Sequence, residues 1–73
     1  MNKKDIFQLI SKNLKVPEED INIETSSKNF GAWDSLAHLR IILELEKRSN
    51  IKVRNDQIGE LNSVKKIIKY FVV

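Results

Sequence analysis

The segment from residue 34 to residue 49, DSLAHLRIILELEKRS, limits what this 73-residue chain can fold into more than any other stretch. Placed on a helix, its apolar residues cover most of the circumference: Leu36, Ala37, Leu39, Ile41, Ile42, Leu43 and Leu45. A helix that is apolar on nearly every side is usually buried on more than one side. We therefore expect a helix from Asp34 or Ser35 to about Ser49, with the other helices packed around it.

Amphipathic helices are predicted on both sides of this central segment. In residues 3–14, apolar side chains recur at helical spacing, which predicts a first helix. In residues 64–72, the i, i+3, i+4, i+7 pattern is unbroken, lysines occupy the other face, and Ser63 is a suitable N-cap. A short third helix is expected at about residues 56–61, where Asn55 can cap the first turn.

The segment between the first two predicted helices completes the expected architecture. From residue 21 to residue 33 there is no sustained periodicity, and residues that favour turns are frequent. A loop of this length in a small domain is usually functional or disordered. We expect an all-α four-helix bundle with three longer helices, a short third helix and a long loop between helices one and two. Residues 1–73 would form it as a single domain.

The composition excludes several classes of site. There is no cysteine, which rules out disulfides, thiol nucleophiles and cysteine-based zinc sites. A single histidine and scattered carboxylates predict no metal site. The formal net charge of +3 comes from dispersed residues, without the basic runs or interleaved aromatic residues of nucleic-acid binders. No segment has the features of a signal peptide or a membrane span, so we expect a cytoplasmic monomer that does not insert into membranes.

The Asp34–Ser35–Leu36 step at the start of the central helix is the candidate site. The Asp34 carboxylate can cap the helix, which leaves the Ser35 hydroxyl in the first turn beside unpaired backbone N–H groups. The positive end of the helix dipole suits an anion there, such as a phosphate ester. We expect Leu36 to enter the core and fix the helix start. Asp and Ser are also common at helix starts, so the pair alone is consistent with a structural role.

No catalytic constellation accompanies Ser35. His38, one turn later, is the only candidate base, and no third group is placed to orient it. His38 lies on the same helix face as Ser35 and could contact a phosphate attached there, but a solvated helix position is the simpler interpretation of His38. Because acid, base and oxyanion groups do not converge, we expect no enzymatic activity of the chain itself. A serine that another enzyme modifies needs no base of its own.

The chain resembles the acyl carrier protein family over nearly its whole length, as a stand-alone member. The resemblance rests on NFGAWDSLAHLRIILELE (residues 29–46), where a glycine and a short spacer precede Asp-Ser-Leu and a long apolar helix. It continues through NIKV (residues 50–53) and QIGELNSVKKIIKYF (residues 57–71), which stand where the family has a connector and its third and fourth helices. Asp-Ser-Leu alone is a weak signal, but at this position in this order of helices it is a strong one.

The resemblance implies a carrier function centred on Ser35. A phosphopantetheinyl transferase would attach 4'-phosphopantetheine from coenzyme A to the hydroxyl, with magnesium held by the transferase and the coenzyme. The arm ends in a thiol, which would carry acyl or aminoacyl groups as thioesters from an activating ligase to a downstream transferase or synthase. The family can shelter the acyl chain between its second, third and fourth helices. The residues placed to line that shelter, which would serve equally well as ordinary core residues, are Leu39, Ile42, Ile58, Leu61 and Ile67.

The charge of the second helix departs from the family pattern, in which this helix and the stretch after it are usually acidic. From residue 35 to residue 58 the basic residues outnumber the acidic ones by five to three: Arg40, Lys47, Arg48, Lys52 and Arg54 against Glu44, Glu46 and Asp56. Because complementary charge guides partner choice, we expect a specialised biosynthetic pathway rather than fatty-acid synthase enzymes. We place Trp33, His38 and Arg40 on the partner-facing surface, with a loop anchor as the other interpretation of Trp33.

Two other functions are compatible with the sequence. The same bundle and the same Asp-Ser cap would serve an unmodified, carrier-like adaptor protein. A small helical DNA-binding domain would explain the positive charge, but the central helix is too apolar to expose a row of base-reading side chains. Salt-dependent retention on nucleic acid would distinguish that domain from a carrier.

Overall fold

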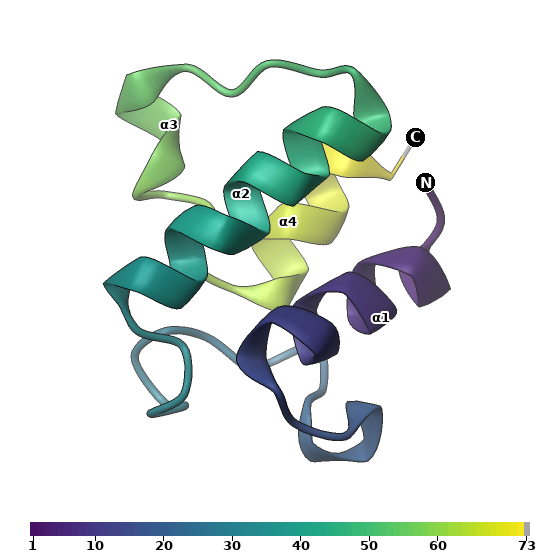
Figure 1. Cartoon of the computed structure of the whole chain (residues 1–73), viewed down its shortest axis with the longest axis vertical. Helices are drawn as coiled ribbons and strands as arrows, with labels where there is room; N and C mark the ends of the chain where they lie inside the picture. Colours follow the sequence, from purple (N-terminus) through teal and green to yellow (C-terminus); the bar gives the residue numbers. More distant parts are fainter. Residues whose placement is uncertain (73) are drawn as a thin grey trace.

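The computed structural model describes residues 1–72, and within them the regular structure is helical apart from an isolated β-bridge (Figure 1). In chain order the elements are α1 (Lys3–Leu14), the 3₁₀ turn η1 (Glu18–Asp20), α2 (Ser35–Ser49), α3 (Asn55–Ile58) and α4 (Val64–Phe71). The predicted all-α four-helix bundle is confirmed, including the short third helix and the long connection between α1 and α2. No helix in the described part of the chain is long and apolar enough to cross a membrane.

The longer helices begin at side chains that cap them. At α1, Asn2 accepts a hydrogen bond from the Asp5 N–H at 2.8 Å, and Asp5 accepts one from the Asn2 N–H at 3.1 Å. Asp34 and Ser63 accept hydrogen bonds from N–H groups three residues further on, at 2.8 and 3.1 Å. These contacts satisfy N–H groups that lack a partner within the helix. The N-caps predicted at Asp34 and Ser63 are therefore confirmed.

The third helix differs from its prediction. It spans four residues and ends at Ile58, whereas a helix of residues 56–61 was expected. Asn55 lies inside the helix, and the N-cap is Arg54, whose side chain makes no capping hydrogen bond. A single turn has too few intrahelical hydrogen bonds to be stable alone. Two contacts support this turn from other helices: His38 Nε2 of α2 lies 2.7 Å from the Ile58 carbonyl oxygen, and the Tyr70 hydroxyl of α4 donates to Gln57 Oε1 at 3.0 Å.

The core lies between α1, α2 and α4, and α1 packs against both other helices (Figure 1). Buried side chains from all three helices fill it: Ile6, Ile10, Ile41, Leu45, Ile67 and Phe71. Removing each such side chain from water stabilises the fold by about 1.5–3 kcal/mol before the entropy of ordering is subtracted.

The expectation that α2 is buried on more than one side is wrong. Its buried residues form one stripe, which consists of Ala37, Ile41, Ile42 and Leu45. The leucines on its other side are 64, 46 and 57% exposed: Leu36, Leu39 and Leu43. Within the described chain, helices cover the inner face of α2 but nothing packs over its outer face. Apolar character alone does not reveal this difference, because apolar side chains also occur on protein surfaces.

A pairing between distant segments orders the long loop before α2. Ser26 and Ser63 form an antiparallel β-bridge. Beside it, the Ser27 N–H donates to the Asn62 carbonyl oxygen at 2.9 Å. These contacts hold the loop against the connection between α3 and α4. The start of α2 is therefore surrounded by residues that are far apart in the sequence.

Candidate functional site at the start of α2

Ser35 is the first residue of α2, and its side chain is exposed. The preceding Asp34 caps the helix through a hydrogen bond of 2.8 Å from the Ala37 N–H to its carboxylate. The helix start is therefore complete without the Ser35 hydroxyl, which stands on a rigid element and faces solvent. This agrees with the arrangement expected from the sequence.

A pocket of about 380 Å³ lies beside Ser35. Three segments line it, namely the loop before α2, the first turn of α2 and the connection between α3 and α4. The lining residues are Ser27, Trp33, Asp34, Ser35, His38, Gly59 and Asn62. Ser27, Gly59 and Asn62 were not expected at this site, because the bridge that brings their segments together pairs residues distant along the chain. No motif signals such a pairing.

Trp33, His38 and the carbonyl group of Ile58 form a chain of hydrogen bonds next to this pocket. The Trp33 Nε1–H donates to His38 Nδ1 at 3.0 Å, and His38 Nε2 lies 2.7 Å from the Ile58 carbonyl oxygen. Because Nδ1 accepts a hydrogen bond, we assign the proton to Nε2, which donates to Ile58. The loop, the first turn of α2 and the end of α3 are thereby joined.

Two of the three residues assigned to the partner-facing surface do not serve it as predicted. Trp33 is only 2% exposed and is a loop anchor in the core, so its assignment to a contact surface is wrong. His38 is half-buried with both ring nitrogens engaged, so it is neither a solvated helix residue nor a group free to contact a phosphate. Arg40 is exposed, and its place on such a surface stays a prediction.

The prediction that Leu36 enters the core is also wrong. Its side chain is 64% exposed, while the next residue, Ala37, is 2% exposed and points inward. At about 100° per residue, Leu36 falls on the side of α2 opposite the buried stripe, whereas Ala37 belongs to that stripe. Trp33 and Ala37, rather than Leu36, anchor the start of α2.

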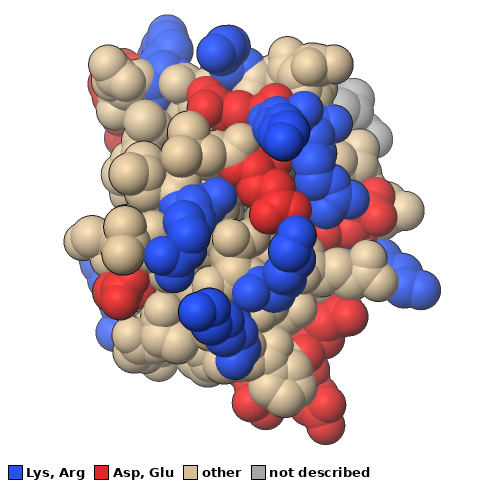
Figure 2. All heavy atoms as spheres, viewed as in Figure 1, with Lys and Arg blue, Asp and Glu red and all other residues tan. Residues whose placement is uncertain are grey.

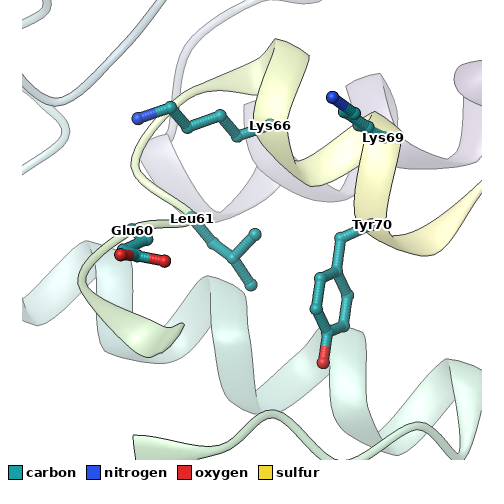
Figure 3. Close-up of a pocket in the computed structure, with 5 residues that line it drawn as sticks. All are labelled: Glu60, Leu61, Lys66, Lys69 and Tyr70. Atoms are coloured by element: carbon teal, nitrogen blue, oxygen red, sulfur yellow. The ribbon is translucent and has the colours of Figure 1, made fainter. Parts of the chain in front are cut away.

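The five residues predicted to line an acyl shelter do not surround one cavity. Ile42 and Ile67 are closed into the core at 1 and 0% exposure, and Leu39 faces outward at 46%. Ile58 is half-buried. Leu61 lines a separate pocket of about 470 Å³ together with Glu60, Lys66, Lys69 and Tyr70. In Figure 3, the Leu61 side chain lies below two lysines of α4, Lys66 and Lys69. A shelter for an acyl chain therefore stays a prediction.

The start of α2 offers one exposed hydroxyl surrounded by hydrogen-bond donors. Among the described residues, the N–H groups of Ser35 and Leu36 have no backbone acceptor. The side chains of Ser27 and Asn62 add donors within the pocket. This donor set, at the positive end of a fifteen-residue helix, suits a phosphate ester on Ser35. Both ring nitrogens of His38 are engaged in other hydrogen bonds, so His38 is not placed to act as a base for the Ser35 hydroxyl.

Comparison with known families agrees with this chemistry. The family described as "Phosphopantetheine attachment site" matches residues 4–71, from the first turn of α1 to the last residue of α4. The matched range includes Ser35 and all segments that line the pocket beside it. No curated protein matches the chain.

Proposed function

Because the chain belongs to the phosphopantetheine-attachment family, that of the acyl carrier proteins, we propose that it carries acyl or aminoacyl groups on an arm bound to Ser35. The family fixes the cofactor as covalent 4'-phosphopantetheine and the general role as that of a carrier. The observation that supports Ser35 as the attachment residue is its exposed hydroxyl, which the helix cap at Asp34 leaves unused.

Three other serines are poorer candidates for attachment because their hydroxyls already have structural roles. The Ser63 hydroxyl accepts the hydrogen bond that caps α4. The hydroxyls of Ser11 and Ser49 donate to carbonyl oxygens of their own helices, at 3.1 and 2.6 Å. Modifying any of these would remove a hydrogen bond that the fold uses, whereas modifying Ser35 would not.

The residues around Ser35 would hold the arm rather than react with its cargo. The N–H groups of Ser35 and Leu36 would stabilise the negative charge of the phosphodiester. The hydrogen-bond chain from Trp33 through His38 keeps the neighbouring segments in place. When bound, the cofactor supplies a terminal thiol for thioester formation, which this cysteine-free chain lacks. On attachment, the Ser35 oxygen would displace adenosine 3',5'-bisphosphate from the phosphorus of the phosphopantetheine arm of coenzyme A, and the hydroxyl proton would pass to a base of the transferase.

The partners in this proposal are enzymes that act on the arm or its cargo. They comprise a phosphopantetheinyl transferase, an acyl- or aminoacyl-activating ligase, and a transferase or synthase that accepts the acyl group. Members of the family are generally non-catalytic. Tethering would present the cargo at high effective concentration without tight binding by the chain.

Peptide mapping after enzymatic loading tests the attachment residue. The chain is incubated with coenzyme A, magnesium and a broad-specificity phosphopantetheinyl transferase, digested, and sequenced by tandem mass spectrometry. The added mass is expected on Ser35 alone. Thioester formation is then tested by loading an acyl group and treating the product with neutral hydroxylamine, which should release that group. An arm located on Ser27 or Ser63 would contradict the proposal.

A further inference from the structure

The pocket between the α3–α4 connection and α4 has an apolar centre. In Figure 3, the Leu61 side chain lies between those of Glu60 and Tyr70, and Leu61 is only 6% exposed. The Tyr70 hydroxyl donates a hydrogen bond of 3.0 Å to Gln57 Oε1, which holds the aromatic ring in place as a wall of the pocket. A hollow of about 470 Å³ with apolar walls and a few polar groups has the size and character of a site for a small organic ligand.

The charged groups of this pocket favour an anion. Two lysines and one glutamate line it: Lys66, Lys69 and Glu60. Lys66 Nζ lies 3.4 Å from the Asn62 amide oxygen, and neither lysine forms an ion pair with any residue that the structure describes. Both lysines lie above Leu61 in Figure 3. Their ammonium groups can therefore contact the anionic end of a ligand whose apolar part packs against Leu61.

The α3–α4 connection lies between this pocket and the one beside Ser35. Gly59 and Asn62 line the pocket beside Ser35, whereas Glu60 and Leu61 line the other. Consecutive Cα atoms are about 3.8 Å apart, so those of Gly59 and Leu61 are at most about 7.6 Å from each other. The phosphopantetheine arm consists of pantoyl, β-alanyl and cysteamine units, which together extend further than two residues. A group at the end of the arm can therefore reach this pocket from Ser35.

We propose that this pocket holds the distal end of the cargo and selects acyl groups that end in a carboxylate. This inference rests on the proposed function, since the cargo reaches the pocket on an arm attached to Ser35. Lys66 and Lys69 contact the carboxylate. Leu61 and the Tyr70 ring contact the methylene groups between the carboxylate and the thioester. An acyl group that ends in a methyl group lacks the contacts with the two ammonium groups.

Positive charge alone does not define this site. Figure 2 shows lysine and arginine side chains on the side of the molecule where α2 lies in front as well. The pocket differs from a merely cationic surface in containing Glu60, whose carboxylate repels a carboxylate on the cargo. Removing this one negative charge should therefore strengthen the binding of the cargo, which gives the test a second, opposite sign.

The test compares two cargoes of equal length on the same chain. A broad-specificity phosphopantetheinyl transferase with magnesium loads the chain from glutaryl-coenzyme A or pentanoyl-coenzyme A, whose acyl groups end in a carboxylate and a methyl group. Nuclear Overhauser effects between the methylene protons of the cargo and the Leu61 methyl groups are measured. We expect them to be about threefold stronger with the glutaryl cargo at about 0.02 M salt, and similar for both cargoes at about 0.5 M salt.

Substitutions in the pocket should change this preference in opposite directions. Lys66→Gln/Lys69→Gln should reduce the glutaryl signal to the pentanoyl level, whereas Glu60→Gln should raise the glutaryl signal. The matched control is Lys4→Gln/Lys65→Gln, which removes the same charge from the first turns of α1 and α4 without changing a residue that lines the pocket. This control should keep the preference of the natural sequence.

Three results would decide against one or the other part of the account. Equal signals for both cargoes, or the same loss of preference in both double variants, would overturn the selection of cargo and leave the carrier function standing. Contacts of both cargoes with Leu39 or Ile42 in place of Leu61 would also overturn it. Failure of a folded sample to be loaded from either coenzyme A derivative would instead contradict the carrier function, because loading concerns Ser35 and not this pocket.

Discussion

The indole N–H of Trp33 donates a hydrogen bond of 3.0 Å to Nδ1 of His38, between the loop before α2 and the first turn of that helix. On the other side of the ring, His38 Nε2 lies 2.7 Å from the Ile58 carbonyl oxygen at the end of α3. One side chain therefore links three segments next to Ser35. His38 serves as a positioning residue, although its place in the sequence suggested either a solvated residue or a contact for phosphate.

Replacing His38 with Leu should destabilise the fold by about 1–3 kcal/mol, because the Trp33 N–H and the Ile58 carbonyl group lose their partner. Trp33→Phe keeps most of the buried ring but lacks the donor, and should cost about 0.5–1.5 kcal/mol. Urea denaturation of the two single variants and the double variant measures their coupling. If the stability loss of the double variant equals the sum of the two single losses to within about 0.3 kcal/mol, the two side chains are not coupled in solution.

The cap of α2 should depend on Asp34 and not on Ser35. Asp34→Ala should lower the free energy of unfolding by about 1 kcal/mol, because the Ala37 N–H loses its acceptor. Asp34→Asn retains a side-chain acceptor and is the matched control, with a loss of only a few tenths of a kcal/mol. Ser35→Ala should leave stability and helix content nearly unchanged. A larger loss for Ser35→Ala than for Asp34→Ala would refute this assignment of the cap.

The leucines of α2 should separate into two classes of stability effect. Leu45 is 0% exposed, so Leu45→Ala should destabilise by about 2–5 kcal/mol through lost burial and the cavity left behind. Leu36 is 64% exposed, so Leu36→Ala should change stability by less than about 0.5 kcal/mol. Chemical denaturation of both variants gives the comparison. Similar losses at the two positions would mean that Leu36 is buried in solution.

Features with a local physical cause could be predicted from the sequence. The caps at Asp34 and Ser63 and the bounds of α1 and α2 follow from side chains within a few residues of each helix end. The position of Ser35 beside an independent cap follows from the same local signals. The Asp34–Ser35–Leu36 step, at its position in this order of helices, also indicated the family.

Features that depend on contacts between distant segments could not be predicted. The Ser26–Ser63 bridge brings Ser27 and Asn62 to the pocket beside Ser35. No local sequence pattern predicts this bridge. The outer leucines of α2 were expected in the core because they are apolar. Apolar character alone does not show whether another segment of the chain packs against a side chain. Trp33 had two interpretations, and its burial decides between them.

The most direct test of the carrier function is the intact mass of the chain after incubation with coenzyme A, magnesium and a broad-specificity phosphopantetheinyl transferase. The natural sequence is compared with Ser35→Ala and with Ser27→Ala, a matched control from the same pocket. We predict that the natural sequence and Ser27→Ala each gain one phosphopantetheine, while Ser35→Ala gains none. A full gain of mass by folded Ser35→Ala, or no gain by the natural sequence with several transferases, would contradict attachment at Ser35.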